Sequence, residues 1–212
     1  MFKIGDIVTR KKYGHDILFK INKIDKNKCE LCGLDVRLLA DANIDDLELS
    51  TYNKKKEKYR SIRELNTGDY YFIPGSILHI DSDDDYIERS KEYYKENKLT
   101  SYCFKYNENE YRNNVKKLLL KYKPNNLVET GHDAYNKKEK SYKNSKYYIE
   151  TVAEARKILD ENKLTIVAGA CQSDFKSIIK NGASFASSPS HINIHALDPA
   201  IVASYAAFTD KN

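Results

Sequence analysis

The chain has 212 residues, of which 41% are hydrophobic and 32% are charged, with 36 Lys and Arg against 31 Asp and Glu. This apolar content can bury a core, which excludes a disordered chain, a collagen and a disulfide-stapled miniprotein. The formal charge of +5 is weakly basic and selects neither nucleic acid nor an anionic surface as a partner. The charged start, MFKIGD, does not fit a secretory signal, and no run approaches the roughly 18 apolar residues of a membrane span. We therefore expect cytoplasmic synthesis and no membrane insertion.

Short β-like runs separated by turn residues fill the first part of the chain, at 2–10, 17–24, 28–34, 36–40 and 47–49. Their close spacing without helical periodicity predicts a small antiparallel β-barrel of SH3-like size over residues 1–50. A charge run beginning Asn53-Lys54-Lys55-Lys56 follows. We interpret residues 51–73 as a charged linker or exposed helix rather than as a nucleic-acid patch.

Beyond Pro74 the pattern changes to strands that alternate with helices. The sequence predicts strands at 76–80, 100–106, 127–130, 164–170 and 183–186, and helices at 85–97, 108–122, 145–162, 173–180 and 199–207. Apolar strands joined through helices are typical of a parallel sheet that is covered on both faces. We therefore predict that residues 74–212 form an α/β domain.

Two strand ends carry residues suited to catalysis. One strand runs into Gly131-His132-Asp133, and the next runs into Gly169-Ala170-Cys171-Gln172. Ligands bind at the carboxyl ends of strands in open α/β sheets, and strands joined by one crossover helix are usually neighbours about 4.8 Å apart. The sequence therefore predicts that His132 and Cys171 lie within reach of each other.

A histidine beside a cysteine suits nucleophilic catalysis, because a thiol is mostly protonated at neutral pH and needs an adjacent base. The helix predicted from Ser173 would favour the thiolate through its N-terminal amides, which could also donate to an oxyanion. Spacing alone leaves a second interpretation open, in which Cys171 is a buried core thiol and His132 is a turn residue.

Several segments resemble a known family: GHDAY (131–135), ETVAEAR (150–156), AGACQS (168–173), GASFASSPSHINIHALDP (182–199), FKIGDIVTRK (2–11) and DVRLLAD (35–41). They look like the YabG sporulation-specific proteases of endospore-forming bacteria, and the likeness covers nearly the whole chain. The resemblance implies a cysteine endopeptidase with His132 and Cys171 as its dyad. It further implies processing of spore-coat and related spore proteins after Arg or Lys, autoprocessing, synthesis in the sporulating mother cell and association with the spore coat.

The strand-then-His and strand-then-Ala-Cys pattern is also similar to the caspase, gingipain and clostripain group, which implies a caspase-like sheet. That group usually has Gly after the histidine, where this chain has Asp133, and often has an acid or amide two residues before the cysteine, where this chain has Gly169. Which group joins the Cys171 amide in binding the oxyanion is therefore undecided. The candidates for an oxyanion-binding or orienting role are Gly131, Asp133 and Gln172. Asp133 in particular could orient His132 as the carboxylate of a triad does.

The substrate-binding residues must then be sought at other positions. The acids that could bind a basic substrate side chain are Glu129, Asp133, Asp174 and Asp198. Asp198 also fits a helix N-cap, because Pro199 follows it. Ser187, Ser188 and Asn193 follow the fifth predicted strand, where they could line the cleft or make ordinary loop hydrogen bonds.

The remaining motifs predict no metal and no cofactor. Cys29 and Cys32 have the spacing of half a zinc site without a second pair, and His191 and His195 lie four apart without an intervening Glu. Nucleic-acid binding is not expected, although a catalytically inactive spore-coat assembly or nucleic-acid-binding factor stays open as the second hypothesis. Because the family generally continues with further elements, we expect a protease domain shortened at its C-terminus. The oligomeric state is open.

Overall fold

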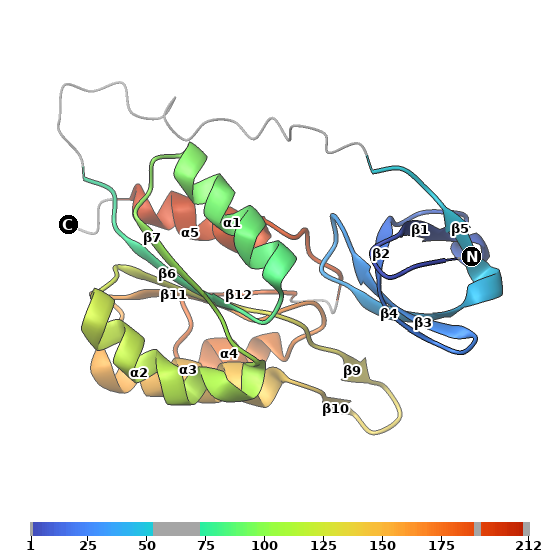
Figure 1. The fold of residues 1–212 in the computed structure, drawn as a ribbon. Helices are drawn as coiled ribbons and strands as arrows, with labels where there is room; N and C mark the ends of the chain where they lie inside the picture. The colour runs from blue at the N-terminus through green and yellow to red at the C-terminus, as the bar shows by residue number, and fades with distance from the viewer. Residues whose placement is uncertain (1, 53–72, 189–191, 210–212) are drawn as a thin grey trace. The chain divides into compact units, whose positions relative to one another are not determined.

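The computed structural model describes residues 2–52, 73–188 and 192–209 (Figure 1). The chain divides into two compact units, residues 1–59 and 60–212. Residues 53–72 of the predicted linker lie outside the described residues. No helix in the described ranges is long and apolar enough to cross a membrane.

The first unit contains a five-stranded antiparallel sheet in the order β4-β3-β2-β1-β5. Its strands are β1 (Ile7–Arg10), β2 (Phe19–Asp25), β3 (Lys28–Gly33), β4 (Leu39–Asn43) and β5 (Leu47–Leu49), with short 3₁₀ helices at Lys11–Tyr13 and Ile44–Asp46. The side chains that fill its core include Val8, Phe19, Ile21, Leu31 and Leu47. The strand pairs found among the described residues do not close β4 onto β5, so the SH3-like barrel stays a prediction.

The fourth strand begins at Leu39, later than the predicted 36–40, because a tight turn follows Gly33. Gly33 N–H donates to the Leu38 carbonyl and Leu38 N–H donates to the Val36 carbonyl, each at 2.8 Å. A Cβ at position 33 would lie 2.3 Å from the Val36 carbonyl oxygen, so the turn requires glycine.

The second unit is built on a five-stranded sheet whose neighbouring strands are all parallel, in the order β12-β11-β8-β6-β7. The strands are β6 (Ile77–Asp81), β7 (Ser101–Lys105), β8 (Asn126–Thr130), β11 (Thr165–Ala168) and β12 (Phe185–Ala186). The predicted α/β class and the parallel sheet are confirmed.

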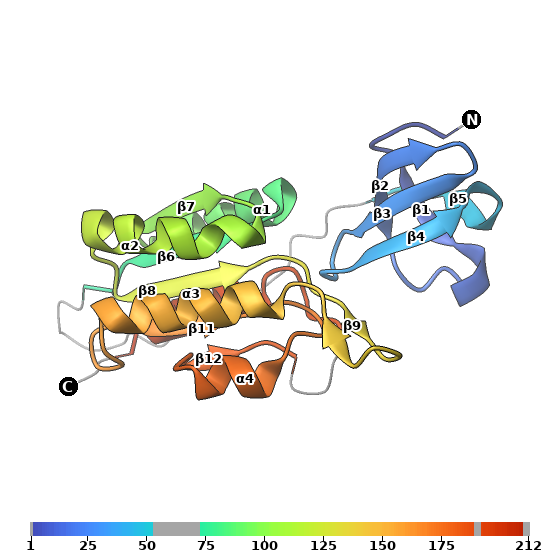
Figure 2. The same ribbon diagram turned by 90° about the horizontal axis from the view of Figure 1, so that it is seen from below.

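Helices cover both faces of this sheet, as predicted (Figures 1 and 2). Helices α1 (Asp84–Glu96) and α5 (Asp198–Ala207) lie on one face, and α2 (Tyr111–Tyr122), α3 (Ser145–Ile158) and α4 (Phe175–Lys180) lie on the other. The main core lies between the sheet and the second group of helices. It includes Leu78, Ile80, Leu127 and Ile166 from the strands and Tyr111, Val115, Leu119, Tyr148 and Val152 from α2 and α3.

Several element ends and one loop differ from the sequence prediction. Residues 108–110 of the predicted helix 108–122 form a separate 3₁₀ helix, Glu108–Glu110, before α2, and strands β11 and β12 are shorter than predicted. Helix α3 ends at Ile158 instead of 162, and α4 begins at Phe175 instead of 173, because the Asp174 side chain accepts the Ser177 N–H and caps the helix there. The polar loop after β8 contains a short hairpin of β9 (Tyr135–Asn136) and β10 (Ser141–Tyr142). Its strands are too short for alternation to be visible in the sequence.

Candidate active site

The strand order places a topological switch point between β6 and β8. The chain passes from β6 to β7 on one side and later returns to β8 on the other side of β6. In open α/β sheets the ligand crevice lies outside the carboxyl ends of the strands at such a point. The two strands end opposite each other, with Asp81 paired to Thr130, and His132 lies two residues after the end of β8.

The two predicted catalytic loops lie at the same edge of the sheet. Strands β8 and β11 are hydrogen-bonded neighbours, and Gly169 N–H donates to the Glu129 carbonyl at 3.0 Å. Beyond the strands, Tyr135 N–H donates to Gln172 Oε1 at 3.2 Å. The His132 loop and the Cys171 loop are thus tied directly to each other.

Ser145, at the start of α3, joins these two loops a second time. Its hydroxyl donates to Asp133 Oδ2 and accepts the Asp174 N–H, the latter at 2.7 Å. Asp133 Oδ1 also accepts the N–H groups of Ala134 and Asn144, at 2.8 and 2.7 Å. Burial raises the pKa of Asp133 despite these donors. In this structure the Asp133 carboxyl braces its own loop, and its predicted role in orienting His132 stays a prediction.

Cys171 lies in a turn with unusual backbone angles. Gly169 has a φ of +100° and Gln172 a φ of 59°, and Ala170 N–H donates to Ser173 Oγ at 2.8 Å. The Cys171 side chain is only 3% exposed, and its sulfur accepts the Ile194 N–H at 3.1 Å. A backbone donor at this distance stabilises negative charge on sulfur.

The thiols of Cys29 and Cys103 favour the protonated form. Burial raises the pKa of Cys103 to about 11 and raises the pKa of Cys29, so both thiols stay protonated at neutral pH. A thiolate is the reactive form of cysteine. Cys103 therefore offers a matched comparison for Cys171.

His132 is held by four groups from three other parts of the unit. Its ring Nε2 lies 3.2 Å from Asp83 Oδ2, and its N–H donates to Glu108 Oε1 at 3.0 Å. Its carbonyl accepts from Asn144 Nδ2 at 2.8 Å and from the Tyr148 hydroxyl at 3.3 Å. These contacts fix the backbone of His132 and one edge of its ring.

Asp83 and Glu108 both contact His132, and the sequence analysis named neither as a site candidate. The run Asp81-Ser82-Asp83-Asp84 indicates a helix cap, and the Asp83 side chain does cap α1. The additional signal for Asp83 was its place two residues after the end of β6, because the carboxyl end of a strand is where ligands bind in this class of sheet.

Glu129 is completely buried at the end of β8. Neither of its carboxyl oxygens has a hydrogen-bond partner in the part of the chain that the structure describes, and the hydroxyl of nearby Thr151 donates to the Tyr147 carbonyl instead. Burial raises the pKa of Glu129 well above its ordinary value. In this conformation the side chain has no surface that a substrate could touch.

The other predicted substrate-binding residues lie in two places. Ser188 accepts the Gln172 N–H at 3.2 Å and Ser187 N–H donates to the Ala168 carbonyl at 3.0 Å, so both adjoin the Cys171 turn. Asn193 is exposed and directly precedes Ile194. Asp198 is the first residue of α5 rather than its N-cap, and its Oδ2 accepts the His195 N–H at 2.9 Å.

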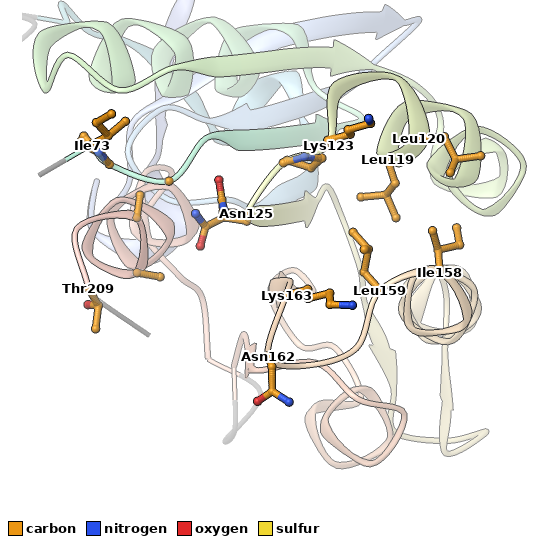
Figure 3. Close-up of a pocket in the computed structure, with 16 residues that line it drawn as sticks. Ile73, Leu119, Leu120, Lys123, Asn125, Ile158, Leu159, Asn162, Lys163 and Thr209 are labelled. Atoms are coloured by element: carbon orange, nitrogen blue, oxygen red, sulfur yellow. The ribbon is translucent and has the colours of Figure 1, made fainter. Parts of the chain in front are cut away.

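A cavity of about 730 Å³ lies at the opposite end of the sheet (Figure 3). Gly75, Asn125 and Asn126, which line it, precede or begin strands β6 and β8, and Leu119, Ile158 and Leu159 come from α2 and the end of α3. Because it adjoins the amino ends of the strands, this cavity is separate from the His132 and Cys171 loops.

Comparison with known proteins identifies the family. The family model described as YabG peptidase U57 matches residues 3–212. The chain is also 36% identical to the sporulation-specific protease YabG of Bacillus subtilis (strain 168), over an alignment of 248 residues that covers 98% of this chain and 86% of the relative. The match spans both compact units and both predicted catalytic loops. The chain therefore belongs to the YabG peptidase family, U57.

Proposed function

We propose that this chain is a sporulation-specific cysteine endopeptidase whose nucleophile is Cys171 and whose general base is His132. Membership of a peptidase family and the name of the Bacillus subtilis relative support the activity. The observation that carries the residue assignment is the hydrogen bond from Tyr135 to Gln172. It joins the loop after β8 to the loop after β11 at the edge of the sheet where ligands bind.

In the proposed reaction the Cys171 sulfur attacks the scissile carbonyl carbon and His132 takes the thiol proton. The tetrahedral intermediate collapses to a thioester as His132 gives that proton to the leaving amine. A water molecule then attacks the thioester, His132 accepts its proton, and the carboxylic acid product leaves as Cys171 regains a proton.

The oxyanion needs two donors close to the sulfur. We propose the Cys171 backbone amide as the first, with Gly131 and the Gln172 side chain as candidates for the second. The backbone amides of His132 and Gln172 already donate to Glu108 and Ser188 in this structure. Helix α4 begins beyond Cys171, at Phe175, so its N-terminus is not assigned this role.

The proposed substrates are spore-coat and related spore proteins, cut after Arg or Lys, with autoprocessing of the enzyme itself. Asp174 and Asp198 are the proposed acids for a basic substrate side chain, and Glu129 would join them only after leaving the buried position that it has in this structure. Ser187, Ser188 and Asn193 are proposed to line the cleft. We further propose a caspase-like fold, a barrel at 1–50 that recruits substrate, synthesis in the mother cell and association with the spore coat.

The test compares wild type with Cys171→Ala and the matched control Cys103→Ala on a denatured coat-protein extract. Mass spectrometry with labelling of new amino termini reports the cut sites. We expect cuts after Arg or Lys with wild type and Cys103→Ala, and none with Cys171→Ala. Identical cut sites for Cys171→Ala would refute the nucleophile. Binding of coat protein without any cut by wild type would favour an inactive assembly factor.

A further inference from the structure

We propose that Asp83 is the positioning residue of His132: it accepts the ring Nε2–H and thereby leaves Nδ1 as the atom that takes the proton from Cys171. The inference rests on the proposed function, because it assigns the third partner of the proposed dyad. It differs from the expectation that the neighbouring Asp133 has this role.

The contact itself is close and largely shielded from water. Asp83 Oδ2 lies 3.2 Å from His132 Nε2, and the two side chains are 13% and 15% exposed. The Tyr86 ring lies 5.7 Å from the His132 ring, between centroids, and covers part of it. A carboxylate and an imidazole interact more strongly at a partly buried site than in water.

The orientation of the Asp83 carboxylate is fixed by contacts other than the one with His132. Its Oδ1 accepts the N–H groups of Asp85 and Tyr86, at 2.9 and 3.2 Å, as the N-cap of α1. Its own N–H donates to Asp81 Oδ1 at 3.0 Å. Because Oδ1 is held by the helix amides, Oδ2 is presented to His132 in a defined direction.

A buried network holds Asp81 in turn. Asp81 Oδ2 accepts the Thr130 hydroxyl at 2.6 Å, Thr130 Oγ1 lies 3.0 Å from His79 Nε2, and His79 Nδ1 lies 3.0 Å from the Tyr94 hydroxyl. All four side chains are completely buried. The network joins β6, β8 and α1, so it sets the position of Asp83 relative to the strand that leads to His132.

The direction of the hydrogen bond follows from the charge of Asp83. Burial raises the pKa of Asp83, but the hydrogen bond from His132, the charge of His132 when its ring is protonated and the Tyr86 N–H together hold that pKa below the ordinary value of 3.8, so the carboxyl group is ionised at neutral pH. An ionised carboxylate can only accept a hydrogen bond, so Nε2 carries the proton. Neutral imidazole then has its lone pair on Nδ1, which is the basic atom.

Asp83→Asn tests this assignment with little change at the helix. Asn is also a good N-cap, so the start of α1 is kept while the charge is lost. The matched control is Asp84→Asn, which removes an equal charge one residue later, from an exposed pair with Lys105. Cleavage of the denatured coat-protein extract gives kcat and KM, and circular dichroism reports folding.

We expect Asp83→Asn to lower kcat about 100-fold, near the low end of general acid–base contributions, with KM within about threefold. Asp84→Asn should keep kcat within about twofold, since exposed pairs contribute little. A folded Asp83→Asn variant with kcat near wild type would overturn the proposal.

A second measurement does not depend on proteolysis. The ¹⁵N shifts of the His132 ring in wild type distinguish the Nε2–H from the Nδ1–H tautomer of the neutral ring. We expect Nε2–H, and the Nδ1–H tautomer would overturn the proposal even if Asp83→Asn fails to fold. Failure of the proposed function would appear differently, as cleavage that survives Cys171→Ala.

Discussion

The backbone N–H of Ile194 donates to the sulfur of Cys171 at 3.1 Å, joining residues 23 apart in the chain. The segment after β12 is therefore part of the environment of Cys171. Ser188 strengthens this arrangement, because its hydroxyl donates to the Ile192 carbonyl at 2.7 Å while accepting the Gln172 N–H. One serine thus connects both sides of Cys171.

Ser188→Ala removes both of these hydrogen bonds. We expect kcat to fall about tenfold, since a hydrogen bond contributes roughly 1 kcal/mol and each 1.4 kcal/mol in the barrier is a factor of ten. The control is Ser141→Ala, because the Ser141 hydroxyl donates to Glu139 on the exposed β9–β10 hairpin. Steady-state cleavage of the coat-protein extract measures both, and equal rates for the two variants would contradict the role of Ser188.

Gly131→Ala tests whether the side chains packed against Gly131 hold His132 in position. A Cβ at this position would lie 2.6 Å from Ser82 Oγ, 2.7 Å from Glu108 Oε1 and 2.8 Å from the Tyr148 hydroxyl. Glu108 and Tyr148 both hydrogen-bond the His132 backbone, so displacing them moves His132. We expect at least a tenfold loss of kcat and a free energy of unfolding lower by about 1–3 kcal/mol, as in overpacked sites.

Ala134→Ser, at an exposed position in the same loop, is the control for Gly131→Ala. It should leave both kcat and the urea midpoint near wild type. An unchanged kcat for Gly131→Ala would show that the Glu108 and Tyr148 contacts do not position His132.

Glu129→Gln should make stability less dependent on pH. Burial raises the pKa of Glu129 in the folded state above the ordinary value of 4.5. The unfolded chain ionises this group as pH rises through 4.5, whereas the folded state keeps its proton, so stability falls between 4.5 and the folded-state pKa. Below that window the group is protonated in both states and carries no such cost.

Urea unfolding of wild type and Glu129→Gln at a series of pH values measures how the free energy of unfolding of each depends on pH. The stability gained by the variant should be smallest at about pH 4 and grow as pH rises above 4.5. A constant difference across the series would contradict it. The same variant tests the proposed substrate-binding role of Glu129. If Glu129 contacts the substrate, Glu129→Gln should lose cleavage after basic residues even though the variant is more stable than wild type.

Arg156→Ala should destabilise the second unit without altering the proposed catalytic residues. The Arg156 guanidinium donates to the carbonyls of Gly182 and Leu164, at 2.7 and 2.8 Å, and so joins α3 to β11 and to the turn before β12. We expect the free energy of unfolding to fall by about 2–3 kcal/mol, the range for hydrogen bonds from a charged group. Lys157→Ala, from an exposed pair with Glu154, should cost below about 0.5 kcal/mol. A similar urea midpoint for both variants would contradict this role.

The sequence predicted the parallel sheet, because its strands are short apolar runs separated by amphipathic helices. It also predicted that the loops after 127–130 and 164–170 meet, since consecutive parallel strands are usually neighbours. Asp83 was not linked to His132 because the two lie 49 residues apart. Their contact depends on β6 lying between β7 and β8, and strand order is not visible in local periodicity.

Covalent labelling tests the central claim, that Cys171 is a nucleophile activated by His132. Wild type, Cys171→Ala, His132→Ala and Cys103→Ala would each be treated with peptidyl acyloxymethyl ketones ending in Arg, Lys, Leu or Asp, and the adducts located by peptide mass mapping. The account predicts an adduct on Cys171 in wild type and Cys103→Ala, and none in the other two variants. An adduct on a different residue, or equal labelling of Cys171 in wild type and His132→Ala, would contradict it.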